Sequence, residues 1–188
     1  MPDLTNPQAD DLPFEKITLD EVGEAINATS SSSAPGCSQM NYQVVKWAWR
    51  SNTGKQYILL LVRKCLEAGY HPKAWRRAIV VVLRKPGKPD YSNLRAYRLI
   101  TLLECLGKIL EKIVARQLTF LAGNYNLVPA NQFGGCSNSS TTDALLTFTN
   151  DVQCAWNHRM VMSALTFDIK GYFDFVNHNQ LLSELHHK

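Results

Sequence analysis

Most hydrophobic positions of the chain repeat with the period of an α-helix. Apolar residues three or four positions apart, together with polar residues near the helix starts, predict helices over 19–28, 40–50, 53–69, 101–121 and 141–157. The helix within 101–121 is the clearest, because seven apolar side chains line one of its faces. The amino-terminal third of the chain is therefore predicted to be helical.

Polar residues mark the starts of these helices. Capping boxes, in which a side chain at each end satisfies a backbone amide at the other, are predicted at 18–21 and 53–56. Thr101 and Glu104 are expected to cap the longest helix, and Glu104 is also expected to pair with Lys108 one turn later.

The hydrophobic pattern changes to short β-branched runs in two regions. The run AIVVVL at 78–83 meets RKPGKP, whose prolines and glycine fit a turn, and AYRLI at 96–100 can pair with it as a basic β-hairpin. The run VMSALTF at 161–167 predicts a buried strand that ends at Asp168, where a carboxylate projects from the sheet edge. Helices with these few strands predict an α+β fold.

The charges are distributed unevenly along the chain, although the formal net charge is only +4. Residues 1–45 contain one Lys and seven Asp or Glu, whereas 46–116 contain sixteen Lys or Arg and four acids. Residues 117–188 contain three basic and five acidic residues. A middle segment with a net charge of +12 favours a polyanionic partner such as nucleic acid, and a solvated charged face is the alternative.

Composition excludes several classes of protein. A hydrophobic content of 45% supports a packed core and argues against disorder. The five cysteines are scattered without a C-x-x-C pair, so we expect free thiols in a reducing compartment. The longest apolar run, YILLLV at 57–62, is too short to span a bilayer, and no signal peptide is recognisable. We expect a soluble intracellular protein of the cytoplasm or nucleus with no membrane partner.

Four blocks of residues, in order and at plausible spacing, resemble the reverse transcriptase domain of LINE-type (non-LTR) retrotransposons. They are SAPG at 33–36, RKPGKP with YRLITLLECLGKILEKIVARQL, NQFGG with STTDAL, and FDIKGYFDFVNH at 167–178. Together they cover roughly 30–185. The resemblance implies a right-hand polymerase fold, of which the fingers and the start of the palm are present.

The resemblance also implies a division of the chain. Residues 1–29 are expected to form an acidic amino-terminal segment with a short helix. Residues 30–157 correspond to the fingers, and 158–188 to a truncated start of the palm. The implied activity is that of an RNA-directed DNA polymerase, whose partners are an RNA template, a DNA primer and deoxynucleoside triphosphates.

Five residues take roles from the family motifs. Asp168 is similar in position to the first metal-binding aspartate of the palm, with the backbone carbonyl of Ile169 as a second contact to Mg²⁺. Phe173 corresponds to the steric gate that excludes a ribose 2′-hydroxyl, although ordinary core packing is its alternative role. Lys85 and Arg98, which flank the hairpin turn, correspond to the pair that contacts the triphosphate. Two Mg²⁺ ions would stabilise the attacking and leaving oxygens.

Other cations and tryptophans have open interpretations. Two roles are equally open for four further cations: they contact the template backbone, or they are only solvated. These cations are Arg76, Arg77, Arg84 and Lys88. Stacking against nucleobases and packing in the core are the alternatives for Trp47, Trp49 and Trp75, and core packing is the more common role.

The sequence also departs from the family pattern. Leu99 stands where YRPI has proline, and Cys136 begins a CSNS run in place of an Arg-Pro-Gly-Arg pattern. The paired-aspartate motif and thumb that would follow a palm start do not fit within 180–188. One aspartate cannot hold two divalent cations, so we expect this chain to be inactive alone. The alternative function is a non-catalytic nucleic-acid-binding remnant of a retrotransposon.

Overall fold

The computed structural model describes residues 15–129, 131–169, 171 and 175–186. The chain divides into two compact units. The amino-terminal unit is Phe14–Gln117, and the carboxyl-terminal unit contains Leu118–Lys188. Each unit is described by itself below.

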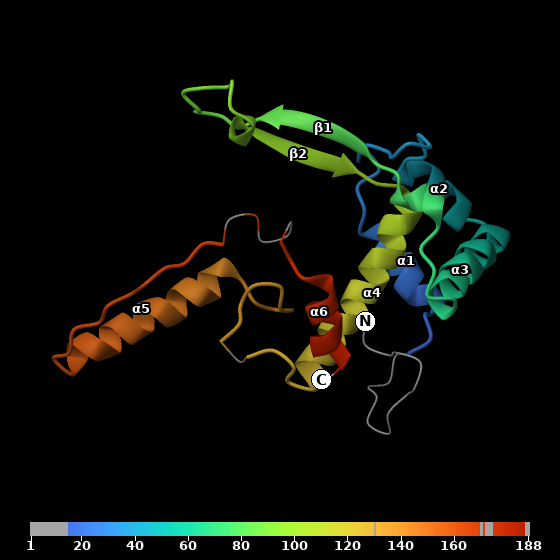
Figure 1. The fold of residues 1–188 in the computed structure, drawn as a ribbon. Coiled ribbons are helices and arrows are strands. Elements are labelled where there is room, and N and C mark those ends of the chain that lie inside the picture. Colours follow the sequence, from blue (N-terminus) through green and yellow to red (C-terminus); the bar gives the residue numbers. More distant parts are fainter. Residues whose placement is uncertain (1–14, 130, 170, 172–174, 187–188) are drawn as a thin grey trace. The chain divides into compact units, whose positions relative to one another are not determined.

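Four helices of the amino-terminal unit follow the predicted hydrophobic period. They are α1 (Leu19–Asn27), α2 (Tyr42–Trp49), α3 (Asn52–Glu67) and α4 (Cys105–Asn124), which begins in this unit and continues past its end. Figure 1 shows α1, α2 and α3 beside the first part of α4. The helical character of the amino-terminal third is therefore confirmed.

The helix starts confirm one capping prediction and correct another. At α1, the Glu21 amide donates to the Thr18 hydroxyl at 3.2 Å, and the Thr18 amide donates to the Glu21 carboxylate at 2.8 Å. At α3 the cap is Ser51, whose hydroxyl accepts from the Gly54 amide at 3.0 Å. The predicted cap Thr53 lies inside the helix because the helix begins at Asn52.

The core of the amino-terminal unit lies where the apolar faces of these helices meet. Fully buried side chains come from the segment before α1, from α1 itself, from α3 and from α4. The largest are Ile17, Val22, Ile26, Val62, Cys105, Ile109 and Ile113. Trp75 from the 3₁₀ helix Lys73–Arg76 joins the same cluster. Burial of these faces is the main term that stabilises the unit.

Glu104 is a buried charged residue of this unit and does not have the role predicted for it. Its side chain is 6% exposed and accepts from the Ser38 amide at 2.7 Å and from the Ser38 hydroxyl. No ion pair with Lys108 is present among the described residues. The prediction was wrong because a partner 66 residues away in the sequence competes for the carboxylate.

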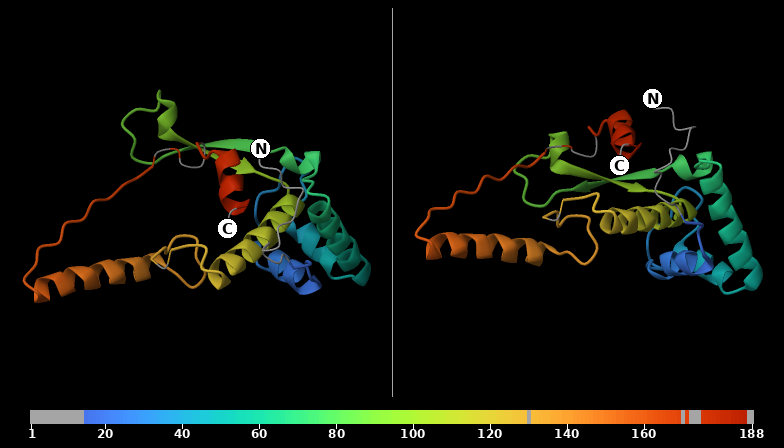
Figure 2. Two further views of the ribbon diagram at one scale, coloured as in Figure 1. Left: turned by 60° about the horizontal axis from the view of Figure 1, so that its bottom comes forward. Right: turned by 90° about the horizontal axis from the view of Figure 1, so that it is seen from below.

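The predicted basic hairpin is confirmed. Strands β1 (Ile79–Arg84) and β2 (Tyr97–Leu102) pair antiparallel, with Ile79 opposite Leu102 and Arg84 opposite Tyr97. A 3₁₀ turn, Leu94–Ala96, precedes β2. In both further views the far end of the hairpin extends beyond α1, α2 and α3, as Figure 2 shows. The fold, helix-rich with a small antiparallel sheet, is α+β as predicted.

The carboxyl-terminal unit contains α5 (Thr141–Asn157), which was predicted, and α6 (His178–His186), which was not. The predicted strand over 161–167 is absent: this described stretch has no regular structure, and Val161 is 94% exposed. A strand needs a hydrogen-bonded neighbour, and the sheet found in the described part of the chain contains only β1 and β2. The expectation of a buried strand ending in Asp168 was therefore wrong.

Candidate nucleotide-binding hairpin

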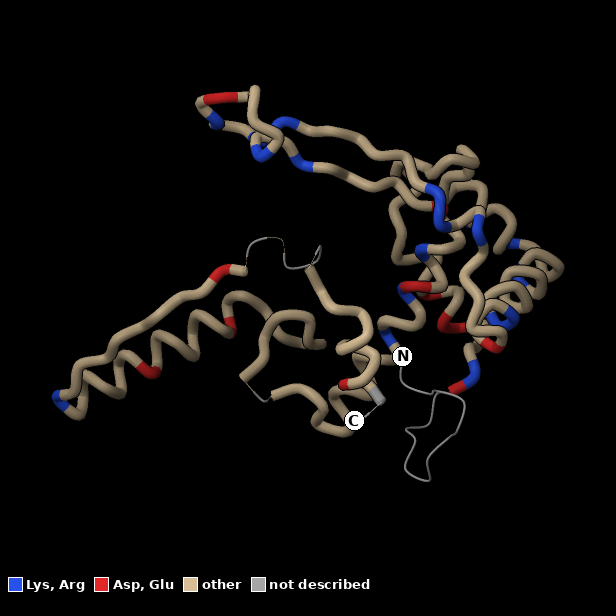
Figure 3. Tube along the Cα trace, viewed as in Figure 1, with Lys and Arg blue, Asp and Glu red and all other residues tan. Residues whose placement is uncertain are grey.

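The far end of the β1–β2 hairpin gathers positive charge, which Figure 3 shows as blue segments. Five cations lie between positions 84 and 98, namely Arg84, Lys85, Lys88, Arg95 and Arg98. The acid in this stretch is Asp90, and hydrogen bonds from the Ser92 amide and hydroxyl hold its pKa below the ordinary value. The net charge of +4 on this short stretch suits an anionic ligand.

The strand register places Lys85 and Arg98 on the same face of the hairpin. Leu83 lies opposite Arg98, and the Lys85 amide donates to the Ala96 carbonyl at 2.8 Å, which extends the ladder by one pair. Side chains alternate along a strand, so Leu83 and Lys85 share a face, and Arg98 joins them from the partner strand. Such diagonal neighbours lie about 7–8 Å apart. The structure therefore brings together the two cations that the motifs had placed on separate strands.

Lys85 and Arg98 differ in how firmly they are held. The half-buried Lys85 donates from its ammonium group to the Arg95 carbonyl at 2.9 Å, which fixes the side chain without neutralising its charge. Arg98 is exposed and has no ion-pair partner among the described residues. An ammonium group held in place on the same face as an exposed guanidinium can help to hold a phosphate group, because guanidinium can donate two parallel hydrogen bonds.

The opposite face of the hairpin carries a different arrangement. Arg84 lies opposite Tyr97 in the register, and its guanidinium lies 5.3 Å from the centre of the Tyr91 ring. The Tyr91 and Tyr97 rings meet edge to face at 6.1 Å. The Tyr91 hydroxyl donates to the Lys85 carbonyl, and the Tyr97 hydroxyl donates to the Tyr91 carbonyl, both at 2.9 Å. These contacts fix the turn, and sequence reasoning missed both tyrosines.

Leu99, which stands in place of the family's proline, fits the ladder without disturbing it. Because Lys85 and Ala96 form a hydrogen-bonded pair, the pair of Val82 and Leu99 three positions along is a non-hydrogen-bonded one. The amide of Leu99 therefore points away from β1, and a proline here would remove no ladder bond.

The predicted metal-binding residues belong to the carboxyl-terminal unit. Asp168 and Ile169 are exposed in the irregular stretch that follows α5, and Phe173 lies outside the described residues. No cluster of three or more His, Cys, Asp or Glu that could hold a metal ion is found where the structure is described. One carboxylate and one carbonyl do not satisfy Mg²⁺, which takes about six oxygen ligands. The described residues thus do not fit a complete magnesium site.

Comparison with known proteins agrees with the motif assignment. A sequence model of the family "Reverse transcriptase (RNA-dependent DNA polymerase)" matches residues 83–187. The chain therefore belongs to the reverse transcriptase family. Its relatives are polymerases of mobile elements, which confirms the resemblance to LINE-type (non-LTR) retrotransposons.

Three relatives illustrate the similarity. The chain is 28% identical to the probable RNA-directed DNA polymerase from transposon BS of Drosophila melanogaster, with 97% of this chain and 20% of that protein covered. It is also 28% identical to the RNA-directed DNA polymerase from mobile element jockey of the same species, over 95% of this chain and 19% of the relative. The Pol polyprotein of retrotransposable element R1 of Bradysia coprophila is 28% identical over 90% of this chain and 16% of the relative. The chain thus spans about a fifth of the length of these relatives or less.

A membrane-spanning helix is not found in the described part of the chain. None of the helices there combines the length and the hydrophobicity that crossing a bilayer requires.

Proposed function

We propose that this chain is the nucleotide-holding part of an RNA-directed DNA polymerase, which copies an RNA template from a DNA primer with deoxynucleoside triphosphates. The observation that carries this proposal is the shared face of Lys85 and Arg98 on a hairpin tip with a net charge of +4, within the region matched by the family. Residues 30–157 act as the fingers and 158–188 as the start of the palm.

The two cations hold the triphosphate of the incoming nucleotide. Positioning of a reactant by fixed charges removes much of the entropy cost of the reaction. Arg98 makes the larger contribution, because its guanidinium is exposed and can bind two phosphate oxygens at once. Phe173 acts as the steric gate against a ribose 2′-hydroxyl.

Asp168 and the carbonyl of Ile169 supply part of a Mg²⁺ site. When bound, two Mg²⁺ ions stabilise the attacking and leaving oxygens of nucleotidyl transfer. Because these two residues do not complete the coordination of either ion, the 188-residue chain alone does not extend a primer. A primer-extension assay with Mg²⁺ and all four deoxynucleotides is expected to give no product, and robust extension would refute this part of the proposal.

Paramagnetic Mn²⁺ tests the role of Asp168 in the isolated chain, because it broadens NMR signals near even a weak binding site. We expect broadening of amide signals around Asp168 in the presence of a deoxynucleotide, and loss of this broadening in Asp168→Ala. Asp151→Ala is the matched control, since Asp151 is an exposed acid of the same unit. Equal broadening in the wild-type chain and in Asp168→Ala would assign the carboxylate a structural role.

A non-catalytic nucleic-acid-binding remnant is the second candidate. It is favoured by the contrast between an organised cationic hairpin and an incomplete carboxylate site. This candidate predicts RNA binding that weakens steeply with salt and is indifferent to Mg²⁺, deoxynucleotides and Asp168→Ala. Nucleotide-dependent Mn²⁺ broadening at Asp168 would exclude it.

A further inference from the structure

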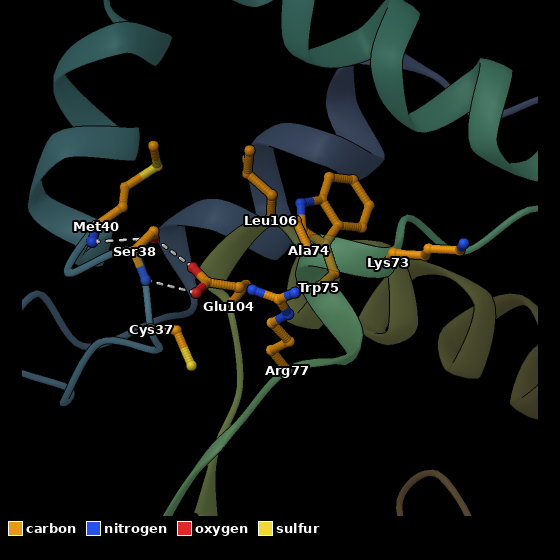
Figure 4. A pocket seen from close by; sticks show the side chains of 9 residues that line it. All are labelled: Cys37, Ser38, Met40, Lys73, Ala74, Trp75, Arg77, Glu104 and Leu106. Carbon is orange, nitrogen blue, oxygen red and sulfur yellow. Dashed lines mark hydrogen bonds between the residues drawn. The ribbon is translucent and has the colours of Figure 1, made fainter.

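The amino-terminal unit contains a cavity of about 540 Å³ that neither the hairpin nor Asp168 lines. Figure 4 shows its walls, which come from the loop around Ser38, the 3₁₀ helix Lys73–Arg76 and the start of α4. Its volume lies within the range of about 300–1,000 Å³ that is common for small-ligand sites.

One wall of this pocket is held by partly buried hydrogen bonds. The Glu104 carboxylate engages both the amide and the hydroxyl of Ser38, as the dashed lines in Figure 4 indicate. The Cys105 thiol also donates to the Met40 carbonyl at 3.1 Å. Gly36 packs so closely that an added Cβ would lie 2.8 Å from the Glu104 amide nitrogen. The loop is therefore fixed on α4, and the pocket is built into the fold.

The pocket combines an apolar interior with a cationic rim. Met40, Trp75 and Leu106 line it, and Trp75 is 8% exposed, with its ring set edge to face against His71 at 5.6 Å. Lys73 and Arg77 also line the pocket, and both are exposed without an ion-pair partner in the described ranges. The Glu104 oxygens are already engaged by Ser38.

This chemistry matches one unit of a single-stranded nucleic acid. A nucleobase presents flat apolar faces, which suit an interior lined by aromatic and thioether side chains. The phosphate groups on either side of that base suit the two rim cations, Lys73 and Arg77. A free triphosphate would instead need several cations gathered around it, as on the hairpin, where Lys85 and Arg98 share a face.

We propose that this pocket receives one nucleotide of a single-stranded RNA, with the base against Trp75 and Met40 and its phosphates at Lys73 and Arg77. The proposal rests on the proposed function and deepens it by assigning a template subsite separate from the triphosphate site on the hairpin. Glu104 acts as a positioning residue, because it holds the loop that forms one wall.

Filling the pocket without changing charge is the sharpest test. Ala74 lines the pocket on the 3₁₀ helix, and Ala74→Phe would occupy part of its volume. We expect the affinity of the full chain for a fluorescein-labelled oligouridylate, measured by fluorescence anisotropy, to fall about tenfold, as the loss of one stacked base predicts. Ala68→Phe is the control, because Ala68 is an exposed alanine at the end of α3 that does not line the pocket.

The rim cations provide a second arm of the test. Arg77→Ala is expected to weaken oligouridylate binding by about fivefold or more, through the loss of a charge-assisted contact with phosphate. Arg50→Ala removes the same charge from an exposed position at the end of α2, outside the pocket, and is expected to have a smaller effect.

Cys37, an exposed residue of the pocket lining, gives a third measurement, in which the test chain keeps all of its native pocket residues. With Cys136 and Cys154 replaced by Ser, the other remaining thiols, Cys65 and Cys105, are buried. Bound oligouridylate is expected to slow alkylation of Cys37 by N-ethylmaleimide. The control keeps Cys154 as the reactive thiol, with Cys37 and Cys136 replaced by Ser, and is expected to show less protection.

The outcomes separate this inference from the proposed function. Unchanged RNA affinity in a folded Ala74→Phe chain, or equal protection of Cys37 and Cys154, overturns the template subsite. If Arg98→Ala still weakens deoxynucleotide binding in that case, the proposed function stands without the subsite. If Ala74→Phe loses its circular dichroism signal, the Arg77→Ala comparison and the Cys37 protection decide the question. A chain that binds no RNA overturns both proposals.

Discussion

The two units of the chain contain similar helices but differ in burial. Helix α1 and helix α5 both begin with a complete capping box, at Thr18–Glu21 and Ser140–Asp143. Four residues of α1 are buried, whereas no residue of α5 is, and no described side chain from 118 to 185 falls in the buried class. An amphipathic sequence therefore predicts a helix in both units, but it does not by itself supply a core.

Hydrogen bonding shows the same difference. In the amino-terminal unit, side chains connect distant segments, such as Arg63 to the Ile17 carbonyl and Gln117 to the Glu21 carboxylate. Between positions 131 and 169, the hydrogen bonds of the described residues join positions at most five apart. The first unit is thus stabilised by tertiary contacts, whereas the hydrogen bonds of the described stretch 131–169 are local.

The largest expected effect comes from removing core volume in the amino-terminal unit. Ile109 is fully buried, so Ile109→Ala should lower the free energy of unfolding by about 2–5 kcal/mol. Leu145, on α5, is 60% exposed, and Leu145→Ala should change it by less than about 0.5 kcal/mol. Urea denaturation followed by circular dichroism measures both. Similar losses for the two variants would show that α5 has a buried partner and would end the contrast between the units.

The hydrogen bonds between Glu104 and Ser38 should be the next largest contribution. Glu104→Ala leaves two donors without their acceptor and is expected to lower the free energy of unfolding by about 1–3 kcal/mol. Glu111→Ala removes an exposed acid of α4 and should have a much smaller effect. The same denaturation experiment compares them, and a neutral Glu104→Ala would contradict the assigned role.

The two capping boxes give a smaller and more direct comparison between the units. Thr18→Ala should lower the free energy of unfolding of the amino-terminal unit by about 1 kcal/mol. Ser140→Ala removes the equivalent cap from α5 and should reduce helix content without moving the unfolding midpoint of the amino-terminal unit. Hydrogen exchange by mass spectrometry resolves each unit. A shifted midpoint in Ser140→Ala would indicate that the units unfold together.

The smallest expected effect is a pH dependence at Glu21. Burial raises the pKa of Glu21, but hydrogen bonds from Gln117 and Thr18 outweigh this and leave the pKa below the ordinary 4.5. A lowered pKa stabilises the folded state above the ordinary value, and this contribution is lost as the pH falls through the lowered value. The stability difference between wild type and Glu21→Gln should therefore shrink on acidification. A constant difference would contradict the assignment.

The elements that depend on residues close together in the sequence were predicted correctly. The helical period and the Thr18 cap were readable because both depend on residues within a few positions. The strand over 161–167 was predicted wrongly because its apolar run indicates burial only if a neighbouring strand exists. Ser51 was missed as the cap of α3 because the start of this helix depends on a tight connection to α2. In this connection Gly54 packs against the Ala48 carbonyl.

The sequence proposed residues for the candidate site but did not give their geometry. Family motifs singled out Lys85 and Arg98, but only the strand register shows that they share a face. The buried Glu104 and the pocket beside it depend on contacts between segments more than 60 positions apart, which no local pattern reveals. The sequence around Ser38 and around Glu104 would look the same whether or not the two segments were in contact.

The most direct test of the central claim compares the two faces of the hairpin. Arg98 shares its face with Lys85, whereas Arg84 lies on the opposite face against Tyr91. Binding of a fluorescent deoxynucleoside triphosphate to the 188-residue chain should weaken about tenfold in Arg98→Ala and change little in Arg84→Ala. Equal effects of the two substitutions, or none from either, would contradict a triphosphate site formed by Lys85 and Arg98.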